Sequence, residues 1–197
     1  MNALRLLLLA CAECMLLAGC RVSEHKDGRN KNVEIGTPFG SMHVKTNDNA
    51  NVAGLGITPY PGAVPDRDEK TDGNAADVNM SFGDFHLGVR AASYRTGDSE
   101  DKVVSFYHKE LSRYGEVLQC RGSHPEGQPA KTAQGLTCDD NNGSHRGHVN
   151  VRSGLELRAG SPQHQHIVSI DPKGDGIKIG LVSLDLPGGH HDSEDTE

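Results

Sequence analysis

Two pairs of closely spaced histidines are the side chains of this sequence best suited to chemistry. His145 and His148 lie in a segment rich in Asn and Gly, and His164 and His166 alternate within a partly apolar run. Residues two apart in a strand share a face, and two imidazoles on one face can chelate zinc or copper. The four histidines therefore form a candidate metal site. The alternative is that His166 packs at the edge of the core and His164 at its rim.

The sequence contains no complete catalytic motif. Residues 99–102, Ser-Glu-Asp-Lys, match the S-x-x-K of penicillin-binding enzymes, but the companion motifs S-D-N and K-T-G are absent and Ser99 suits a helix cap. Residues 139–143, Asp-Asp-Asn-Asn-Gly, depart from a calcium loop because the glycine comes fifth and no Glu follows. A hydrolase site assembled from distant residues stays open as an alternative, because triads are recognised by geometry and not by order.

The first residues have the pattern of a secretory signal. A basic start is followed by an apolar run and then by small residues before Cys20. The run is shorter than the roughly 20 apolar residues that span a bilayer. Leu17-Ala18-Gly19-Cys20 resembles the lipobox of bacterial lipoproteins. The resemblance implies cleavage before Cys20, lipid on its thiol and an acylated amino terminus. With Arg21 next, it implies a periplasm-facing anchor in the outer membrane, or in the cell membrane where there is no outer one.

The remaining cysteines indicate a disulfide. Cys11 and Cys14 form a C-x-x-C that lies in the leader and is expected to be lost with it. Cys120 and Cys138 are then an even pair in an oxidising compartment, where a disulfide is expected. A zinc cluster of these two with nearby histidines has a spacing that matches no common zinc arrangement.

The charge of the chain limits its partners. The formal net charge is −7 at pH 7, which argues against binding nucleic acid and against electrostatic binding to anionic lipid heads. The expected partners are the membrane, through the lipid, and an envelope protein or glycan. We expect no cofactor.

Alternating apolar residues predict four hairpins with apolar cross-strand pairs. The strongest has a two-residue turn at Gly83-Asp84 that suits type II′. A sheet built from such hairpins is antiparallel with one buried face. The predicted pairs are Phe82–Phe85, Met80–Leu87, Val78–Val89, Val33–Val44, Ile35–Met42, Val151–Leu155, Val149–Leu157, Ile170–Ile177 and Val168–Ile179.

One amphipathic helix is predicted over about residues 98–114. Val103, Tyr107, Leu111 and Tyr114 recur at helical spacing, acidic residues fill the first turn, and Gly115 ends it. We expect this helix to pack on the apolar face of the sheet, which makes the fold α+β. Residues 60–63, Tyr-Pro-Gly-Ala, predict a type II turn.

The chain divides into four parts. We expect a signal peptide over 1–19, a lipidated tether over 20–31, a single domain over 32–187 and a disordered acidic tail over 188–197. Segments within residues 32–122 are similar to uncharacterised bacterial lipoproteins and secreted proteins, a resemblance that carries no known activity. The function expected from these features is that of a lipid-anchored envelope protein, more a binding or structural module than an enzyme.

Overall fold

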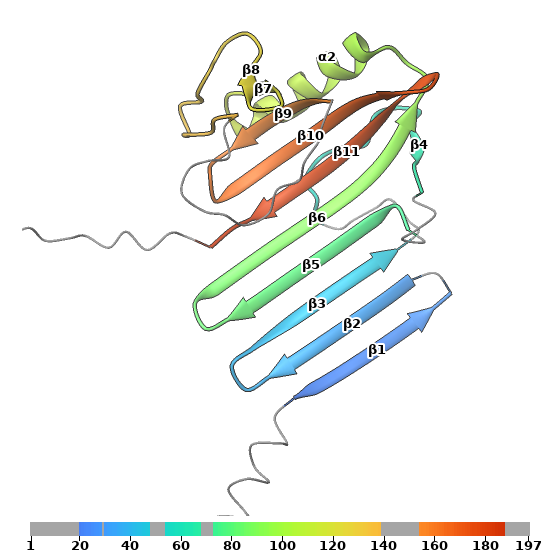
Figure 1. Cartoon of the computed structure of the whole chain (residues 1–197), viewed down its shortest axis with the longest axis vertical. Helices are drawn as coiled ribbons and strands as arrows, with labels where there is room; N and C mark the ends of the chain where they lie inside the picture. The colour runs from blue at the N-terminus through green and yellow to red at the C-terminus, as the bar shows by residue number, and fades with distance from the viewer. Residues whose placement is uncertain (1–19, 29, 48–53, 68–72, 139–153, 188–197) are drawn as a thin grey trace, which may run out of the picture.

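The described part of the protein is a broad antiparallel sheet with one α-helix (Figure 1). The computed structural model describes residues 20–28, 30–47, 54–67, 73–138 and 154–187. Its 11-stranded sheet has the order β1-β2-β3-β5-β6-β11-β10-β9-β7-β8, and β4 pairs with β6 beside this path. The predicted α+β class is confirmed in its broad form, although the protein is mainly β. In chain order the elements are β1 (Arg21–Asp27), β2 (Asn30–Thr37), β3 (Gly40–Asn47), β4 (Val64–Pro65), β5 (Ala75–Phe82), β6 (Phe85–Thr96), α2 (Glu100–Leu111), η1 (Ser112–Tyr114), β7 (Leu118–Arg121), β8 (His124–Pro125), β9 (Leu155–Gly160), β10 (His164–Lys173) and β11 (Gly176–Asp185).

Two of the predicted hairpins are confirmed in full register. In β5 and β6, Phe82 lies opposite Phe85 and Val78 opposite Val89. In β2 and β3, Val33 lies opposite Val44, and the pair Ile35–Met42 also forms. Both hairpins pair apolar side chains on one face, which is the pattern on which the prediction was based.

The other two hairpins differ from prediction. In β10 and β11, Ile170 lies opposite Ile179, so the predicted register is wrong by two residues. The strands continue to Lys173 and Gly176, and a tight turn that starts at Gly174 (φ +66°) joins them. The hairpin predicted around 152–154 involves Val149 and Val151, which lie outside the described residues. Leu155 pairs with Ile170 of β10 and also with a residue of β7.

The polar segment after Cys20 is part of the sheet. We predicted a tether over residues 20–31, but Arg21–Asp27 forms β1 and pairs along its whole length with β2. An edge strand is held by backbone hydrogen bonds, so it needs no apolar side chains. Every residue of β1 is exposed, and its charged side chains discourage a further strand from pairing at this edge.

The predicted helix is confirmed with shorter bounds. α2 runs from Glu100 to Leu111 and continues as the single turn η1. Val103, Tyr107 and Leu111 are fully buried, as their spacing predicted. Gly115 (φ +123°) ends the helical segment, because few residues other than glycine adopt this conformation.

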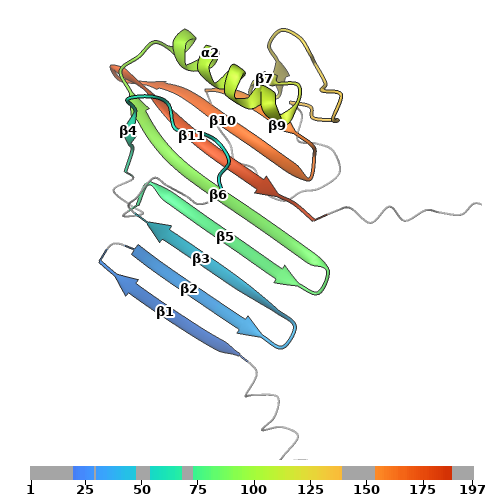
Figure 2. The same ribbon diagram turned by 180° about the vertical axis from the view of Figure 1, so that it is seen from behind.

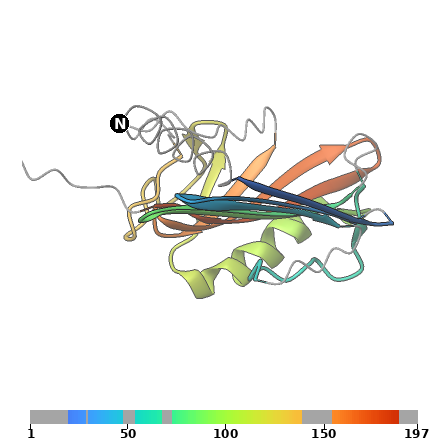
Figure 3. The ribbon, with the colours of Figure 1, turned by 90° about the horizontal axis from the view of Figure 1, so that it is seen from below.

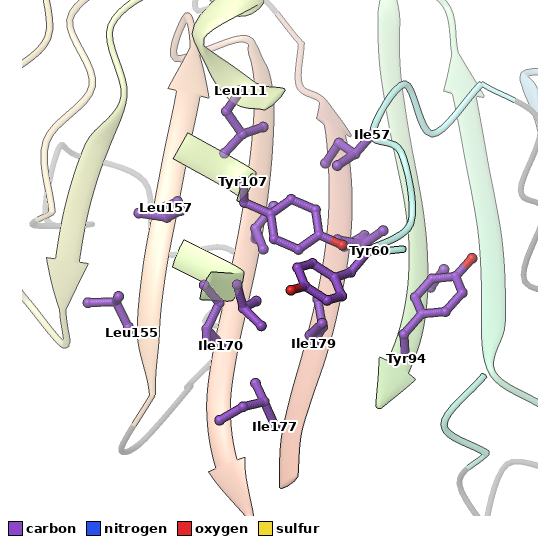
Figure 4. Packing of buried hydrophobic residues seen from close by; sticks show 14 of the residues in the cluster. Ile57, Tyr60, Tyr94, Tyr107, Leu111, Leu155, Leu157, Ile170, Ile177 and Ile179 are labelled. Carbon is purple, nitrogen blue, oxygen red and sulfur yellow. The ribbon is translucent and has the colours of Figure 1, made fainter. Parts of the chain in front are cut away.

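The core lies between the helix and one face of the sheet. Figure 3 shows α2 and the teal segment that contains Tyr60 on the same side of the sheet. In Figure 4 the side chains of Ile57, Tyr60 and Tyr107 gather over Ile179 and its neighbours. The predicted turn at residues 60–63 is confirmed, since the Ala63 amide donates to the Tyr60 carbonyl at 3.0 Å and Gly62 has φ +76°. This turn brings the segment back over the core.

The predicted disulfide is confirmed. Cys120 of β7 is bonded to Cys138, with Cα atoms 5.6 Å apart. Both sulfurs are buried with Leu118 and Leu136 in a small second cluster. The bridge therefore ties the segment after β8 back to the sheet.

The helix does not cover the face that the first two hairpins predicted. Ala92 and Tyr94 of β6 are buried in the cluster beneath the helix, so Leu87 and Val89, at odd positions of the same strand, point to the opposite face. The apolar pattern of β6 changes from odd to even positions where Ala91 and Ala92 follow each other. The prediction that one apolar face serves the whole sheet is therefore wrong.

Candidate functional site

A strip of polar side chains lies on the face of the sheet that carries the helix, next to the part of that face that the helix covers. We call it the histidine strip: His164 and His166 of β10, Asp185 of β11, Arg90 of β6 and Asp77 of β5. Cross-strand pairing places His164 opposite Asp185 and Arg90 opposite Asp77. These strands are neighbours in the sheet (Figure 2), and their pairing places the polar residues in one row across four strands.

Ionic contacts run along this strip. The Nδ1 atom of His164 lies 3.0 Å from Oδ1 of Asp185, and Nη1 of Arg90 lies 3.0 Å from Oδ2 of the same carboxylate. The Nε atom of Arg90 lies 3.8 Å from Oδ1 of Asp77. The hydrogen bond with His164 holds the pKa of Asp185 below its ordinary value, and Arg90 acts in the same direction. The strip is therefore a partly solvated network with a carboxylate that stays ionised.

A glycine makes room for this network. Gly88 of β6 lies opposite Asp185, and a Cβ at this position would come within 3.2 Å of the Asp185 carboxylate. The absence of a side chain at Gly88 lets Asp185 lean over β6 toward Arg90. This arrangement follows from the backbone register and one residue identity.

His166 lies in a different environment from His164. Its ring stacks on Tyr114 with centroids 3.6 Å apart and planes at 8°, and its Nδ1 atom is buried without a hydrogen-bond partner. Burial lowers the pKa of His166, and the charge of Arg113 adds to this effect. The ring is therefore neutral at pH 7 and packs as an aromatic surface.

The end of the helix fixes this stack. The hydroxyl of Tyr114 and the guanidinium of Arg113 both donate to the carbonyl of Gly56. Gly56 has φ +74°, and a Cβ at this position would lie 3.0 Å from Nε2 of His166. The segment before Tyr60 therefore approaches the stack closely, and Leu55 and Ile57 on either side of Gly56 are buried in the core.

The structure describes two of the four histidines of the proposed metal site. His164 and His166 share a face, as predicted, and His164 is exposed whereas His166 is half-buried, which matches the packing alternative. His145 and His148 lie outside the described residues. Within the described part of the chain, no group of three or more His, Cys, Asp or Glu side chains is placed to hold a metal. Metal binding through the four histidines stays a prediction.

The same strip is the place to look for a scattered hydrolase site. Ser183 lies opposite His166, and Asp185 lies opposite His164. In a triad the carboxylate orients the histidine that activates the serine. Here Asp185 contacts His164, while the Nδ1 atom of His166 has no partner. The observed contacts therefore fit an electrostatic network at the core edge better than a triad.

The opposite face of the sheet carries a continuous apolar surface. Cross-strand partners form two rows, one through Ile35, Met42 and Met80 and one through Val33, Val44 and Val78. Both rows continue onto β6, and the pair Phe82–Phe85 extends the surface at the turn. We call the following set the open-face patch: Val22, Val33, Ile35, Met42, Val44, Val78, Met80, Phe82, Phe85, Leu87, Val89 and Leu184.

Nothing in the described part of the chain covers this patch. None of its residues belongs to either buried hydrophobic cluster. Val22, Phe82 and Phe85 are 66%, 40% and 38% exposed, and the other nine residues of the patch are partly exposed. Strands β1, β2, β3 and β5 lie at the end of the sheet away from α2 (Figure 1). The open-face patch is thus the largest feature that packing leaves unexplained.

Sequence reasoning missed the main parts of both surfaces. Asp185 ends β11 and Arg90 lies within β6, and nothing in the local sequence indicated that these two side chains meet. The odd-to-even change within β6 was the signal for a second apolar face.

Comparisons with known proteins assign no family. No protein-family model matches the chain, and no curated protein or solved structure is significantly similar to it. Among the described residues, no helix is both long enough and apolar enough to cross a bilayer.

Proposed function

We propose that this protein is a lipid-anchored component of the cell envelope that faces the periplasm and acts as a non-catalytic interaction module. The lipobox-like sequence before Cys20 supports the anchor. Cys20 is exposed and lies one residue before β1. Lipid on this thiol would therefore leave the sheet and the core undisturbed, and three acyl chains exceed the two signals that stable anchoring needs.

The open-face patch is the observation that carries the interaction role. Its 12 side chains each occupy about 33 Å² of sheet, from a strand spacing of about 4.8 Å and a repeat of about 6.8 Å along one face, which gives about 400 Å². This lies within the roughly 300–600 Å² of the largest apolar patch on a typical soluble monomer, and such patches are often functional. The patch lies on one face of a sheet and consists of aliphatic side chains and two phenylalanines, so its partner is a macromolecular surface.

The anchor is tested by fractionation and intact mass. We expect the native chain in the membrane fraction with a diacyl or triacyl mass that begins at Cys20. The Cys20→Ser variant should lose both. An unmodified wild-type chain in the soluble fraction would contradict the anchor.

The interaction role is tested by native electrophoresis of mildly solubilised membranes. We compare Met80→Lys, which places a charge in the patch, with Asn79→Lys, the neighbouring position on the opposite face of β5. The wild type and Asn79→Lys should migrate above the monomer, and Met80→Lys should migrate as a monomer. If all three migrate as monomers, the open-face patch does not serve as an interface.

A further inference from the structure

We infer that the occupant of the open-face patch is a second copy of this chain, packed face to face on the first. This inference rests on the proposed function, because it names the partner of the interaction surface. It follows from the area of the face, from the distribution of charge and aromatic residues, and from the shape of the surface.

The area fits a stable pairing of two copies. About half of the residues in β1, β2, β3, β5, β6 and β11, roughly 26 positions, point to the open face. At about 33 Å² per position the face offers about 850 Å². Stable interfaces bury about 800 Å² per partner with 20–30 residues a side. The open face therefore has the size of a complete interface.

The anatomy of the face also fits. The open-face patch forms an apolar centre, and charged side chains such as Glu24, Lys26 and Lys31 lie beyond it on the same face. An apolar core with a polar rim is the usual composition of a protein interface. Exposed charges on β1 deter pairing at the sheet edge, which leaves the face as the route for association.

The apolar faces of two antiparallel sheets can pack directly against each other. Sheets pack face to face about 10 Å apart, with the mean strand directions within about 30°. An isologous dimer brings the same patch of both copies together across a two-fold axis, and an apolar sheet face can be that patch. The pair would be a β-sandwich with a helix layer on each outer side. Anchors in one membrane would raise the effective concentration of the two copies.

A lipid surface fits the patch less well. Surfaces that lie on membranes combine an apolar face with Lys and Arg around it and with interfacial Trp and Tyr. This chain has no Trp and a net charge of −7. Three of its four tyrosines are buried in the core, and the fourth, Tyr114, stacks on His166 on the helix side. A glycan is also a poor fit, because neither the aliphatic side chains nor the two phenylalanines of the patch offer hydrogen bonds to its hydroxyl groups.

Site-specific photo-crosslinking in cells tests this inference on the full chain. A benzophenone analogue of phenylalanine is placed at Val44 or Met80, near the centre of the patch. The matched controls carry it at His43 or Asn79, the adjacent positions on the other face of β3 and β5. An intact Cys120–Cys138 bond under non-reducing conditions serves as the check on folding in each variant.

We expect both patch positions to give an adduct of twice the monomer mass that contains peptides of this chain alone, at least tenfold above the controls. An adduct with a different protein would overturn the second-copy assignment and leave the interaction role intact. Adducts with lipid, or adduct levels equal to the controls at both patch positions, would overturn the assignment and the interaction role together.

Discussion

The disulfide should make the largest single contribution to holding the segment after β8 on the sheet. Cys120 and Cys138 are separated by 18 residues. The chain-entropy estimate for a loop of this length is about 3 kcal/mol. Packing can replace little of this, because the cluster around the bridge contains only Leu118 and Leu136 besides the two cysteines. The double variant Cys120→Ala/Cys138→Ala should therefore be less stable by about 3 kcal/mol.

Unfolding of the full chain in urea, followed by pulse proteolysis, measures this difference. With a urea dependence of about 2 kcal/mol per molar, the midpoint should fall by about 1.5 M. Leu136→Ala provides the comparison, because it removes packing from the same cluster and keeps the bridge. A shift of about 0.3 M or less is comparable to the error of such measurements. A double variant whose midpoint lies that close to the wild type would refute the reasoning.

Three further predictions concern the core, the His166 stack and one turn. Leu157→Ala should lower the free energy of unfolding by about 3 kcal/mol, because Leu157 is fully buried under the helix, and thermal unfolding checks this. Burial lowers the pKa of His166, so the unfolded chain binds the proton more tightly, and stability should fall as the pH drops below about 6.5. His166→Gln should reduce this dependence of stability on pH, and His108→Gln, at an exposed position, should not. The same dependence in the wild type and in His166→Gln would contradict the stack. Gly160→Ala should cost about 2 kcal/mol or more in urea unfolding, because Gly160 has φ +104° and a methyl group there would collide with the His164 carbonyl.

Alternation of apolar residues predicts strands and faces well and predicts register only where the turn is clear. The β5–β6 hairpin was predicted correctly because Gly83-Asp84 allowed one tight turn between paired apolar residues. A shift of two residues in the register of β10 and β11 leaves every side chain on the same face. By hydrophobicity alone, Ile170 could therefore pair with Ile177 or with Ile179. The tight turn at Gly174 decides between them.

Features held by the backbone or by distant contacts leave weaker signals in the sequence. β1 was missed because an edge strand exposed on both faces has the composition of a tether. The shared face of His164 and His166 was predictable from their spacing. Their different partners were not, because Tyr114 comes from the end of the helix and Asp185 from the end of β11. Which face the helix covers depends on packing among distant strands, and no local pattern records it.

Hydrogen exchange of the full chain, as isolated in mild detergent, tests most directly whether the open face is covered. The described residues place no layer over the patch at β3 and β5, so a partner packed on the patch should slow the exchange of their amides. We expect the amides of β3 and β5 to exchange at least tenfold more slowly in the wild type and in Asn79→Lys than in Met80→Lys. Equal exchange of these strands in all three proteins would contradict the interface on which the proposed function rests.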